Sequence, residues 1–353
     1  MTIHACLKSA FAGGLLAVGL LAGGGARAAE ALNALVWCDH TDPELLKPFE
    51  DANGVKVNTK TFEGTGSAIS ILQQSQKGDW DVLVVDSTDV GRVAAAGLLE
   101  PLDPAGFPWD DIPEKLRDPK LHYVDGKLYA VPEKFGYNAI AYNKEKVDPA
   151  DMRDPAVMWN PKYKNRIAIY DYYMSIIGKV ALALGIDPSK LTMADLPAIR
   201  EKLVLMKENA AMLGEVATVQ SALANGEVDI VIGGGEYAVA GIMHEKPQLD
   251  WVLSNDGGTR WEQAIAMVAG SKKKELARKF LAYIVSPEGQ ARLATSACYW
   301  GMPVNMKAAL TDEQKKILRW DEQPAFLAKS YPYPAPDAAL DKAMQDLWQD
   351  VMH

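Results

Sequence analysis

Short apolar runs alternate with amphipathic segments along most of the chain. Residues 32–37 and 80–85 are strongly apolar, and the second run is typical of a strand buried on both faces of a parallel sheet. Between them, the segment 43–53 places Leu45 and Phe49 on one helical face. The strand–helix order then repeats, which predicts an α/β fold with right-handed crossovers.

The same alternation continues to the C-terminus. We expect further strands at 55–62, 129–131, 137–142, 166–170, 228–232, 251–253 and 261–268. We expect helices at 90–99, 173–184, 194–208, 216–223, 236–243, 274–285, 287–297 and 338–351. No repeat, low-complexity stretch or linker divides the chain into consecutive halves. The pattern therefore favours two α/β lobes joined by chain crossings.

The N-terminus carries a different pattern. Lys8 is the one charged residue in the first nine, an apolar glycine-rich run follows at 10–21, and Ala26-Arg27-Ala28 supplies a small-residue cleavage pattern. A membrane anchor is the alternative, but spanning needs roughly 20 apolar residues. We therefore expect residues 1–28 to be a signal peptide and the mature protein to be periplasmic.

Charge and cysteine content narrow the function. The formal charge is −9, and loss of Lys8 and Arg27 leaves 46 acids against 35 basic residues, or −11. This acidity argues against nucleic-acid binding. Cys38 and Cys298 remain after cleavage, and in an oxidising compartment they either form one disulfide or stay as two buried thiols. Five scattered histidines give no evident metal site.

Motifs of the common enzyme classes are missing from the sequence. There is no Gly-x-Ser-x-Gly elbow, no His-Glu-x-x-His and no Cys-x-x-Cys, and no dinucleotide fingerprint follows the first strand. We therefore expect neither an enzyme nor a bound cofactor.

Several short motifs, taken in order, carry a family resemblance. They are Trp37-Cys38-Asp39, Trp80-Asp81, Asp86-Ser87-Thr88, Val131-Pro132, Tyr142-Asn143, Trp159-Asn160-Pro161, Gly226-Glu227-Val228, Ser286-Pro287-Glu288 and Pro303-Val304-Asn305. The ordered set resembles the periplasmic solute-binding proteins of ABC importers, above all the spermidine/putrescine-binding group.

The resemblance implies a two-lobed periplasmic-binding-protein fold, type II-like, with interleaved α/β domains. One lobe would hold 29–137 plus 264–306, and the other 138–263 plus 307–353. The ligand would lie between the lobes, at the carboxyl ends of the strands. The resemblance also implies a monomer that delivers a small molecule to ABC permease subunits in the inner membrane.

Ligand-contacting positions can be carried over from the resemblance one at a time. They match Trp37, Asp39, His40, Asp86, Ser87, Thr88, Asp171, Tyr172, Ser175, Gly233, Trp261 and Gln263. Polyamine receptors carry acids at the positions of Tyr172, Ser175 and Gln263, and a tryptophan at that of Gly233. These departures weaken the expectation of a polyamine ligand.

The remaining aromatic and acidic residues still suit a cation. Trp37 and Trp261 offer faces that attract cations, and Asp39, Asp86 and Asp171 offer carboxylates. A long, multiply charged ligand would need more acids, because each buried ammonium needs a partner. We therefore expect a small amine or an amino-acid-like compound, such as a polyamine, a γ-amino acid or an opine.

Two glycine-rich turns favour an acidic group on the ligand. Residues 64–67, with Thr65 and Ser67, and residues 233–235 each lead from a strand into a helix N-terminus, where backbone N–H groups favour an anion. Arg260 could add a bidentate clamp for a carboxylate or phosphonate. The triple glycine could equally be a simple tight turn.

Other interpretations of single residues remain open. Asp171 could cap the following helix, Arg260 could pair with a surface acid, and His40 could be a pH-sensitive gate or an ordinary solvated histidine. Tyr172-Tyr173 offers the tyrosine pair of a ferric-ion receptor. A ferric-ion or phosphonate/oxyanion receptor of the same fold is thus the alternative function.

Overall fold

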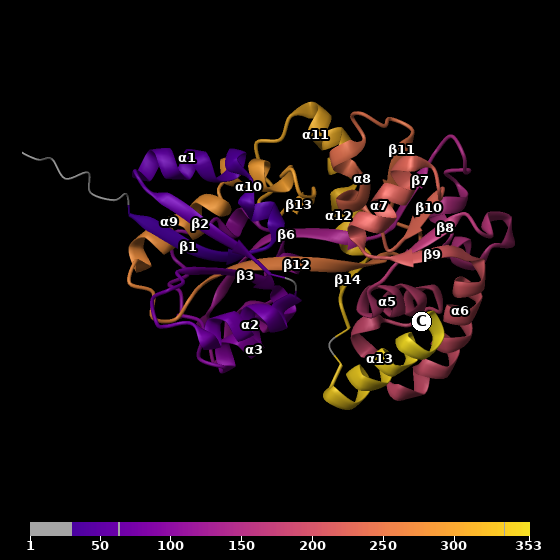
Figure 1. The fold of residues 1–353 in the computed structure, drawn as a ribbon, viewed down its shortest axis with the longest axis horizontal. Helices are drawn as coiled ribbons and strands as arrows, with labels where there is room; N and C mark the ends of the chain where they lie inside the picture. Colours follow the sequence, from indigo (N-terminus) through magenta and orange to yellow (C-terminus); the bar gives the residue numbers. More distant parts are fainter. Residues whose placement is uncertain (1–29, 63, 335) are drawn as a thin grey trace, which may run out of the picture.

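The computed structural model describes residues 30–62, 64–334 and 336–353. The chain forms two α/β halves, each built on its own sheet, and the long strands β6 and β12 run side by side across the middle (Figure 1). The signal peptide expected at 1–28 lies outside the described residues. No described helix is long and apolar enough to cross a bilayer.

The first sheet has the strand order β13-β6-β12-β3-β1-β2, and β14 pairs with β12. Its strands are β1 (Ala31–Val36), β2 (Lys56–Thr61), β3 (Val82–Asp86), β6 (Ala130–Asn138), β12 (Gly258–Met267), β13 (Met302–Pro303) and β14 (Ser330–Pro332). Strand β1 is parallel to β2 and β3, whereas β12 runs antiparallel to β3 and β6. A hairpin of β4 (Tyr123–Val124) and β5 (Lys127–Leu128) lies outside this sheet.

The second sheet has the order β11-β7-β10-β8-β9. Its strands are β7 (Ile140–Asn143), β8 (Ile167–Tyr170), β9 (Ala210–Gly214), β10 (Ile230–Ile232) and β11 (Leu249–Val252). Strand β8 is parallel to both β9 and β10.

Helices cover both faces of each sheet (Figure 1). In sequence they are α1 (Pro43–Asn53), α2 (Gly64–Gln74), α3 (Val90–Ala95), α4 (Pro119–His122), α5 (Tyr173–Ala183), α6 (Leu196–Asn209), α7 (Val216–Asn225), α8 (Glu236–Val239), α9 (Lys274–Ile284), α10 (Pro287–Ala294), α11 (Asp312–Ile317), α12 (Gln323–Ala328) and α13 (Ala338–Met352). On the first sheet, Phe49 of α1 and Phe280 of α9 pack in one cluster, and Leu72 of α2 and Val93 of α3 pack in another. The cores thus lie between helix and sheet, as the apolar periodicity predicts.

Local chemistry explains where the first helix begins and ends. The Asp42 carboxylate accepts the backbone N–H of Glu44, and Pro43 occupies the first turn, where its missing N–H costs nothing. Gly54 ends the helix with a φ of 64°, a left-handed conformation that favours glycine.

Some predicted elements differ from the structure. The strand expected at 137–142 is divided, because β6 pairs with β12 in the first sheet while β7 pairs with β10 and β11 in the second. The helix expected at 236–243 is a single α-helical turn followed by a 3-10 turn. Strand β9 was not predicted, since its sequence Ala-Ala-Met-Leu-Gly lacks the β-branched residues that favour strands. The exact lobe boundaries given above remain a prediction.

Candidate ligand-binding site

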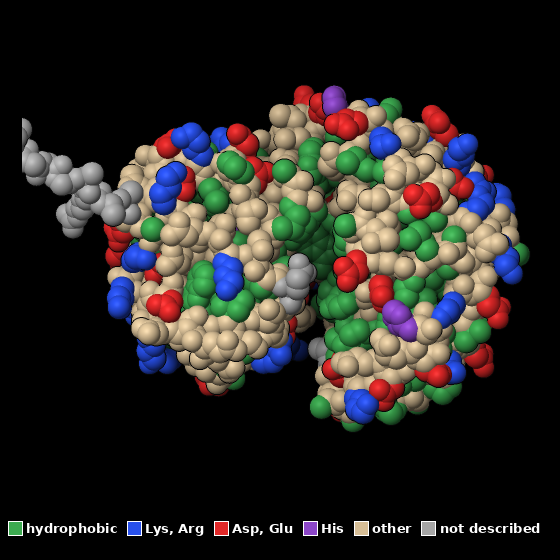
Figure 2. All heavy atoms as spheres, in the orientation of Figure 1, with side chains coloured by type: hydrophobic (Ala, Val, Ile, Leu, Met, Phe, Trp, Pro, Cys, Tyr) green, Lys and Arg blue, Asp and Glu red, His purple; other side chains and the backbone are tan. Residues whose placement is uncertain are grey.

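Loops that follow parallel strands of both sheets carry most of the candidate residues. Trp37 follows β1, Asp86 ends β3, Tyr172 lies two residues beyond β8, and Gly233 follows β10. Figure 2 shows a groove between the two halves, with hydrophobic side chains along its depth. Carboxyl ends of strands are where open α/β sheets bind ligands.

A chain of aromatic contacts connects the two sheets. The ring centroids of Tyr172 and Tyr170 are 5.9 Å apart, and those of Tyr170 and Tyr237 are 6.1 Å apart. The contact from Tyr237 to Trp261 is 6.3 Å, and from Trp261 to Tyr299 it is 6.0 Å. Trp261 belongs to β12, so residues of the second half reach the first half through tilted and edge-on rings.

Further contacts, through Gln263 and Asp86, connect Tyr299 at one end of this aromatic series with Tyr172 at the other. The Gln263 amide donates a hydrogen bond to the Tyr299 hydroxyl, and Gln263 pairs with Asp86 across β12 and β3. Burial, and next the charge of Asp86, raise the pKa of Tyr172 well above its usual value, and the Tyr333 ring lies 5.5 Å from Tyr172. These contacts bring residues from both sheets close together.

Six of the expected site residues share an unusual property. Each has a buried polar side-chain atom without a hydrogen-bond partner among the described residues: Trp37, Thr65, Ser87, Ser175, Trp261 and Gln263. Buried polar groups in proteins are nearly always hydrogen-bonded. The two indole N–H groups can donate, the amide oxygen can accept and the three hydroxyls can do either. Such a set is suited to a polar ligand.

Asp86 is a carboxylate without a basic partner in the described part of the chain. It lines a small pocket with Ser87, Thr88 and Tyr333, and Arg260 and Glu262, which pair with each other, line the same pocket. Burial, with a smaller contribution from the charge of Asp89, raises the pKa of Asp86 to about 7. An ammonium group beside it would reverse that shift.

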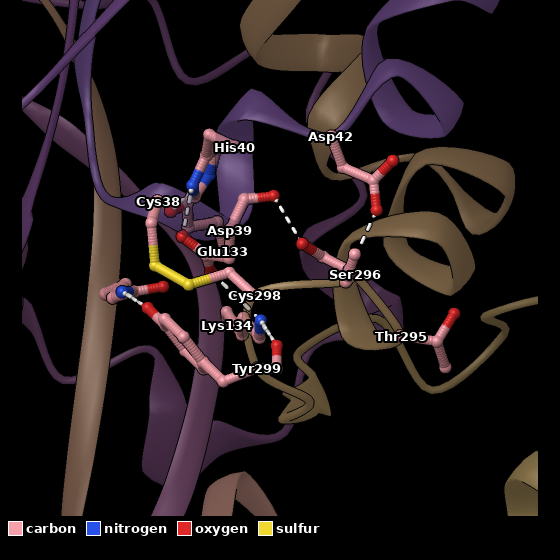
Figure 3. A network of polar contacts seen from close by, with 12 residues as sticks. Cys38, Asp39, His40, Asp42, Glu133, Lys134, Thr295, Ser296, Cys298 and Tyr299 are labelled. Atoms are coloured by element: carbon pink, nitrogen blue, oxygen red, sulfur yellow. Dashed lines mark hydrogen bonds and ion pairs between the residues drawn. A yellow bond between two sulfur atoms is a disulfide. The ribbon is translucent and has the colours of Figure 1, made fainter. Parts of the chain in front are cut away.

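Asp39 and His40 instead belong to a buried charge cluster (Figure 3). The His40 Nδ1 atom lies 2.8 Å from Asp39, its Nε2 atom lies 2.9 Å from Glu133, and the Lys134 ammonium lies 2.9 Å from Asp39. All four side chains have no exposed surface. The structure therefore places His40 in the interior, and neither a solvated loop histidine nor an exposed gate describes it.

Opposite charges outweigh burial at His40 and Asp39, whereas burial raises the pKa of Glu133 above its usual value. Burial would lower the pKa of His40, but the charges of Glu133 and Asp39 raise it to about 10. Burial would raise the pKa of Asp39, but Lys134 and His40 hold it well below its usual value. His40 and Asp39 are thus both charged at neutral pH.

A disulfide lies beside the cluster. Cys38 and Cys298 are bonded, with their Cα atoms 5.9 Å apart and a separation of 260 positions in sequence. The Ser296 hydroxyl donates a 2.7 Å hydrogen bond to the backbone carbonyl of Asp39. Together these contacts fix the loop that carries Tyr299 against the loop after β1 (Figure 3).

Asp171 and Arg260 already have partners within the protein. The Asp171 carboxylate accepts a 2.9 Å hydrogen bond from the Trp348 indole, so α13 holds it, and it does not cap α5. The Arg260 guanidinium lies 2.5 Å from Glu262, and both side chains are buried. Arg260 therefore does pair with an acid, as one interpretation expected, but the acid is interior.

The glycine-rich turns differ in what they can offer a ligand. Thr65 is buried in the first turn of α2, whereas Ser67 and Thr88 are exposed. Gly233 has a φ of 82°, and its carbonyl accepts a hydrogen bond from the Tyr237 hydroxyl. A Cβ at Gly233 would lie 2.7 Å from Ile176, so this position needs glycine for space and for its backbone.

Four residues near the site escaped the sequence analysis: Tyr237, Tyr299, Tyr333 and Glu236. Tyr299 follows the bonded Cys298, which was the one available signal. Glu236 is buried, accepts the Tyr137 backbone N–H at 3.0 Å, and has its pKa raised to about 8 by burial.

In the described residues, no group of three or more His, Cys, Asp or Glu side chains is arranged to hold a metal ion.

Comparisons with known proteins match most of the chain. The family described as bacterial extracellular solute-binding protein matches residues 44–327. Spermidine/putrescine-binding periplasmic protein 1 of Haemophilus influenzae is 25% identical over 329 residues, covering 91% of this chain and 86% of that protein.

Solved structures give the same picture of the fold. The spermidine/putrescine ABC transporter substrate-binding protein of Streptococcus pneumoniae has a TM-score of 0.78 and 20% identity, over 91% of this chain and 98% of that one. A periplasmic binding protein of A. tumefaciens in complex with glucopine has a TM-score of 0.69 and 21% identity, over 92% and 100% of the two chains. The predicted fold class, a two-lobed α/β binding protein, is confirmed.

Proposed function

Because the chain belongs to the bacterial extracellular solute-binding protein family, we propose that it is the periplasmic receptor of an ABC importer for a small ammonium-bearing solute. The observation that carries this proposal is Asp86, a carboxylate without a basic partner in the described chain, beside Tyr172 and Tyr333. The ligand would lie between the two halves, against the aromatic and polar residues described above.

An ammonium group fits the surroundings of Asp86 energetically. Asp86 is partly buried, and a carboxylate and an ammonium ion that leave water together neutralise each other, whereas either one buried alone would carry a desolvation cost. The faces of Tyr172 and Tyr333 would add about 0.5–2 kcal/mol each in a desolvated site. An apolar or purely anionic ligand would leave the carboxylate without a partner.

The unpartnered hydrogen-bonding groups suit an acidic or hydroxylated end on the same ligand. The indole N–H groups of Trp37 and Trp261 are pure donors, so they would pair with a carboxylate or hydroxyl oxygen. We therefore propose an amino-acid-like solute, such as a γ-amino acid or an opine. The solved relative that holds glucopine supports this class, while the relatives named for spermidine and putrescine support a plain polyamine as the second candidate.

Ligand binding would bring the two halves together by a hinge motion. Ligand contacts from both sheets would favour the closed form by differential affinity. The closed form would then dock, as a monomer, on the permease subunits in the inner membrane. Export through the signal peptide at 1–28 and the lobe limits given above are part of the same proposal.

A thermal-shift screen of the purified protein tests the proposal. Ligands that bind only the folded state stabilise it by RT ln(1 + [L]/Kd), so γ-amino acids, opines or small amines should raise the melting temperature without being consumed. A panel of such compounds without effect would contradict the proposal. Metal analysis and a parallel phosphonate series test the ferric-ion and oxyanion alternatives.

A further inference from the structure

We propose that Lys134 is a specificity-determining residue, which fills a second cation position beside the cleft and thereby limits the ligand to one ammonium group. The inference rests on the proposed function, because it concerns which amines the same site accepts. The structure leads to it through the partners of the Lys134 ammonium, their position and their charge.

The Lys134 ammonium has the surroundings of a bound amine (Figure 3). It lies 2.9 Å from an Asp39 carboxylate oxygen and 3.0 Å from the backbone carbonyl of Tyr299. It also lies 4.3 Å from the centre of the Tyr299 ring, and the side chain has no exposed surface. A carboxylate, a carbonyl and an aromatic face are the groups that recognise an ammonium ion in proteins.

This position adjoins the candidate ligand site. A Cβ added to Gly301 would lie 2.6 Å from the Lys134 Cε atom and 2.7 Å from the Trp261 ring, so the lysine stem and the indole meet there. The Tyr299 ring that covers the ammonium also contacts Trp261, and its hydroxyl accepts the Gln263 hydrogen bond. The Tyr299 side chain therefore lies between the Lys134 ammonium and the side chains of Trp261 and Gln263, which are proposed to bind the ligand.

The charges around Lys134 cancel. Asp39 and Glu133 are balanced by His40 and Lys134, so this cluster offers a ligand no spare negative charge. Two other buried acids near Trp261 already have partners. The Glu236 carboxylate accepts the Tyr137 backbone N–H, at 3.0 and 3.3 Å from its two oxygens, and Glu262 pairs with the Arg260 guanidinium.

Asp86 then remains as the carboxylate for the ligand. A solute with one ammonium is satisfied there, whereas a diamine would bury a second ammonium without a partner. The wild-type protein should therefore bind 4-aminobutanoate or a related ω-amino acid at least about tenfold more tightly than a diamine of equal length, as measured by calorimetry, since one unpaired buried charge costs more than the energy of a tenfold change.

Substitution of the lysine should open the second position. In Lys134→Ala the Asp39 carboxylate faces the space left by the side chain. We expect n-propylammonium to raise the melting temperature of this variant saturably, and the amino-acid-to-diamine preference to shift by about tenfold toward the diamine. Neither effect is expected for Lys134→Met, which fills the space, or for Lys134→Ala combined with Asp39→Asn, which removes the carboxylate.

Lys179 provides a matched control. It is also fully buried, and its ammonium bonds to Asp256 at 2.9 Å and to the Gly257 carbonyl at 3.0 Å. Lys179→Ala should lower stability and leave the preference between amino acid and diamine unchanged. An equal shift in this variant would mean that loss of any buried lysine changes the preference, and the inference would fall.

The remaining outcomes test the inference about Lys134 and the proposed receptor function separately. Equal affinity of the wild type for the diamine and the amino acid overturns the inference and leaves the receptor function standing, as does a Lys134→Ala protein with unchanged preference. If Lys134→Ala does not fold even with n-propylammonium present, the wild-type comparison decides alone. If no amine, amino acid or opine binds the wild type, the proposed function and the inference both fail.

Discussion

Asp39 and Asp86 make an instructive pair. Both come from the ends of parallel strands of the same sheet, β1 and β3, and both were expected to hold a ligand cation. Asp39 contacts Lys134 and His40, whereas Asp86 has no basic partner in the described chain. The protein therefore neutralises the buried Asp39 with its own side chains, whereas the partly buried Asp86 is left for the proposed ligand.

The two carboxylates titrate in opposite directions for this reason. Burial favours the protonated form of both acids. Lys134 and His40 reverse the effect at Asp39 and hold its pKa below the usual range, while the pKa of Asp86 is raised to about 7. The same residue type in the same sheet is paired within the protein at Asp39 and is proposed to bind the ligand at Asp86.

The largest expected effect is a loss of stability when the buried charge cluster around Asp39 is broken. Glu133→Gln leaves two buried cations facing Asp39 alone, and loss of one partner in a buried ion pair costs about 3–5 kcal/mol. Denaturant unfolding should show this loss of stability. Asp51→Asn removes an exposed pair with Lys47 and should leave the free energy of unfolding almost unchanged. Equal stability of the two variants would show that the buried cluster is not held by its charges.

The next effect concerns the unpaired carboxylate. Asp86→Asn should weaken binding of an ammonium ligand about 100-fold by calorimetry, since loss of one partner in a buried charged contact costs about 2–5 kcal/mol. The ligand-free variant should also melt higher at pH 8. A raised folded-state pKa means that stability falls as pH rises from about 4 to 7, and asparagine escapes this loss.

Asp346→Asn is the control for this substitution, because Asp346 is exposed and pairs with Lys342. It should leave ligand affinity unchanged. Tight binding by the Asp86→Asn protein would remove Asp86 from the proposed site.

The pH dependence of binding distinguishes the two carboxylates without mutation. Protonated Asp86 cannot pair with an ammonium, so the dissociation constant should be about tenfold higher at pH 6 than at pH 8, given a pKa of about 7. His40 should not contribute, because it has a pKa of about 10 and stays charged over this range. A pH profile that is equally steep in Asp86→Asn would assign the titration to another group.

The smallest expected effect tests one unpartnered hydroxyl. Ser175→Ala should weaken ligand binding about two- to tenfold, the range for one neutral hydrogen bond of about 0.5–1.5 kcal/mol. Ser70→Ala, on the exposed side of α2, should have no effect on affinity. Unchanged affinity in Ser175→Ala would place the ligand away from the start of α5.

The sequence predicted the fold better than it predicted the site. Most strands and helices were expected at their observed positions, because buried elements carry a clear periodicity. It also identified six residues whose polar atoms are buried without a partner. It missed Tyr237, Tyr299 and Tyr333, since a single tyrosine in a loop or in a one-turn helix carries no local signal that distinguishes a cleft wall from ordinary packing.

By itself, the sequence determined the α/β order, the family and the set of acids from which a cation site could be built. Only the tertiary structure decided which of those acids the protein neutralises with its own side chains. Lys134 lies 95 residues from Asp39, and the two meet because β6 passes beside the loop after β1. Charge pairing is set by distance in space, and neither composition nor local pattern contains that distance.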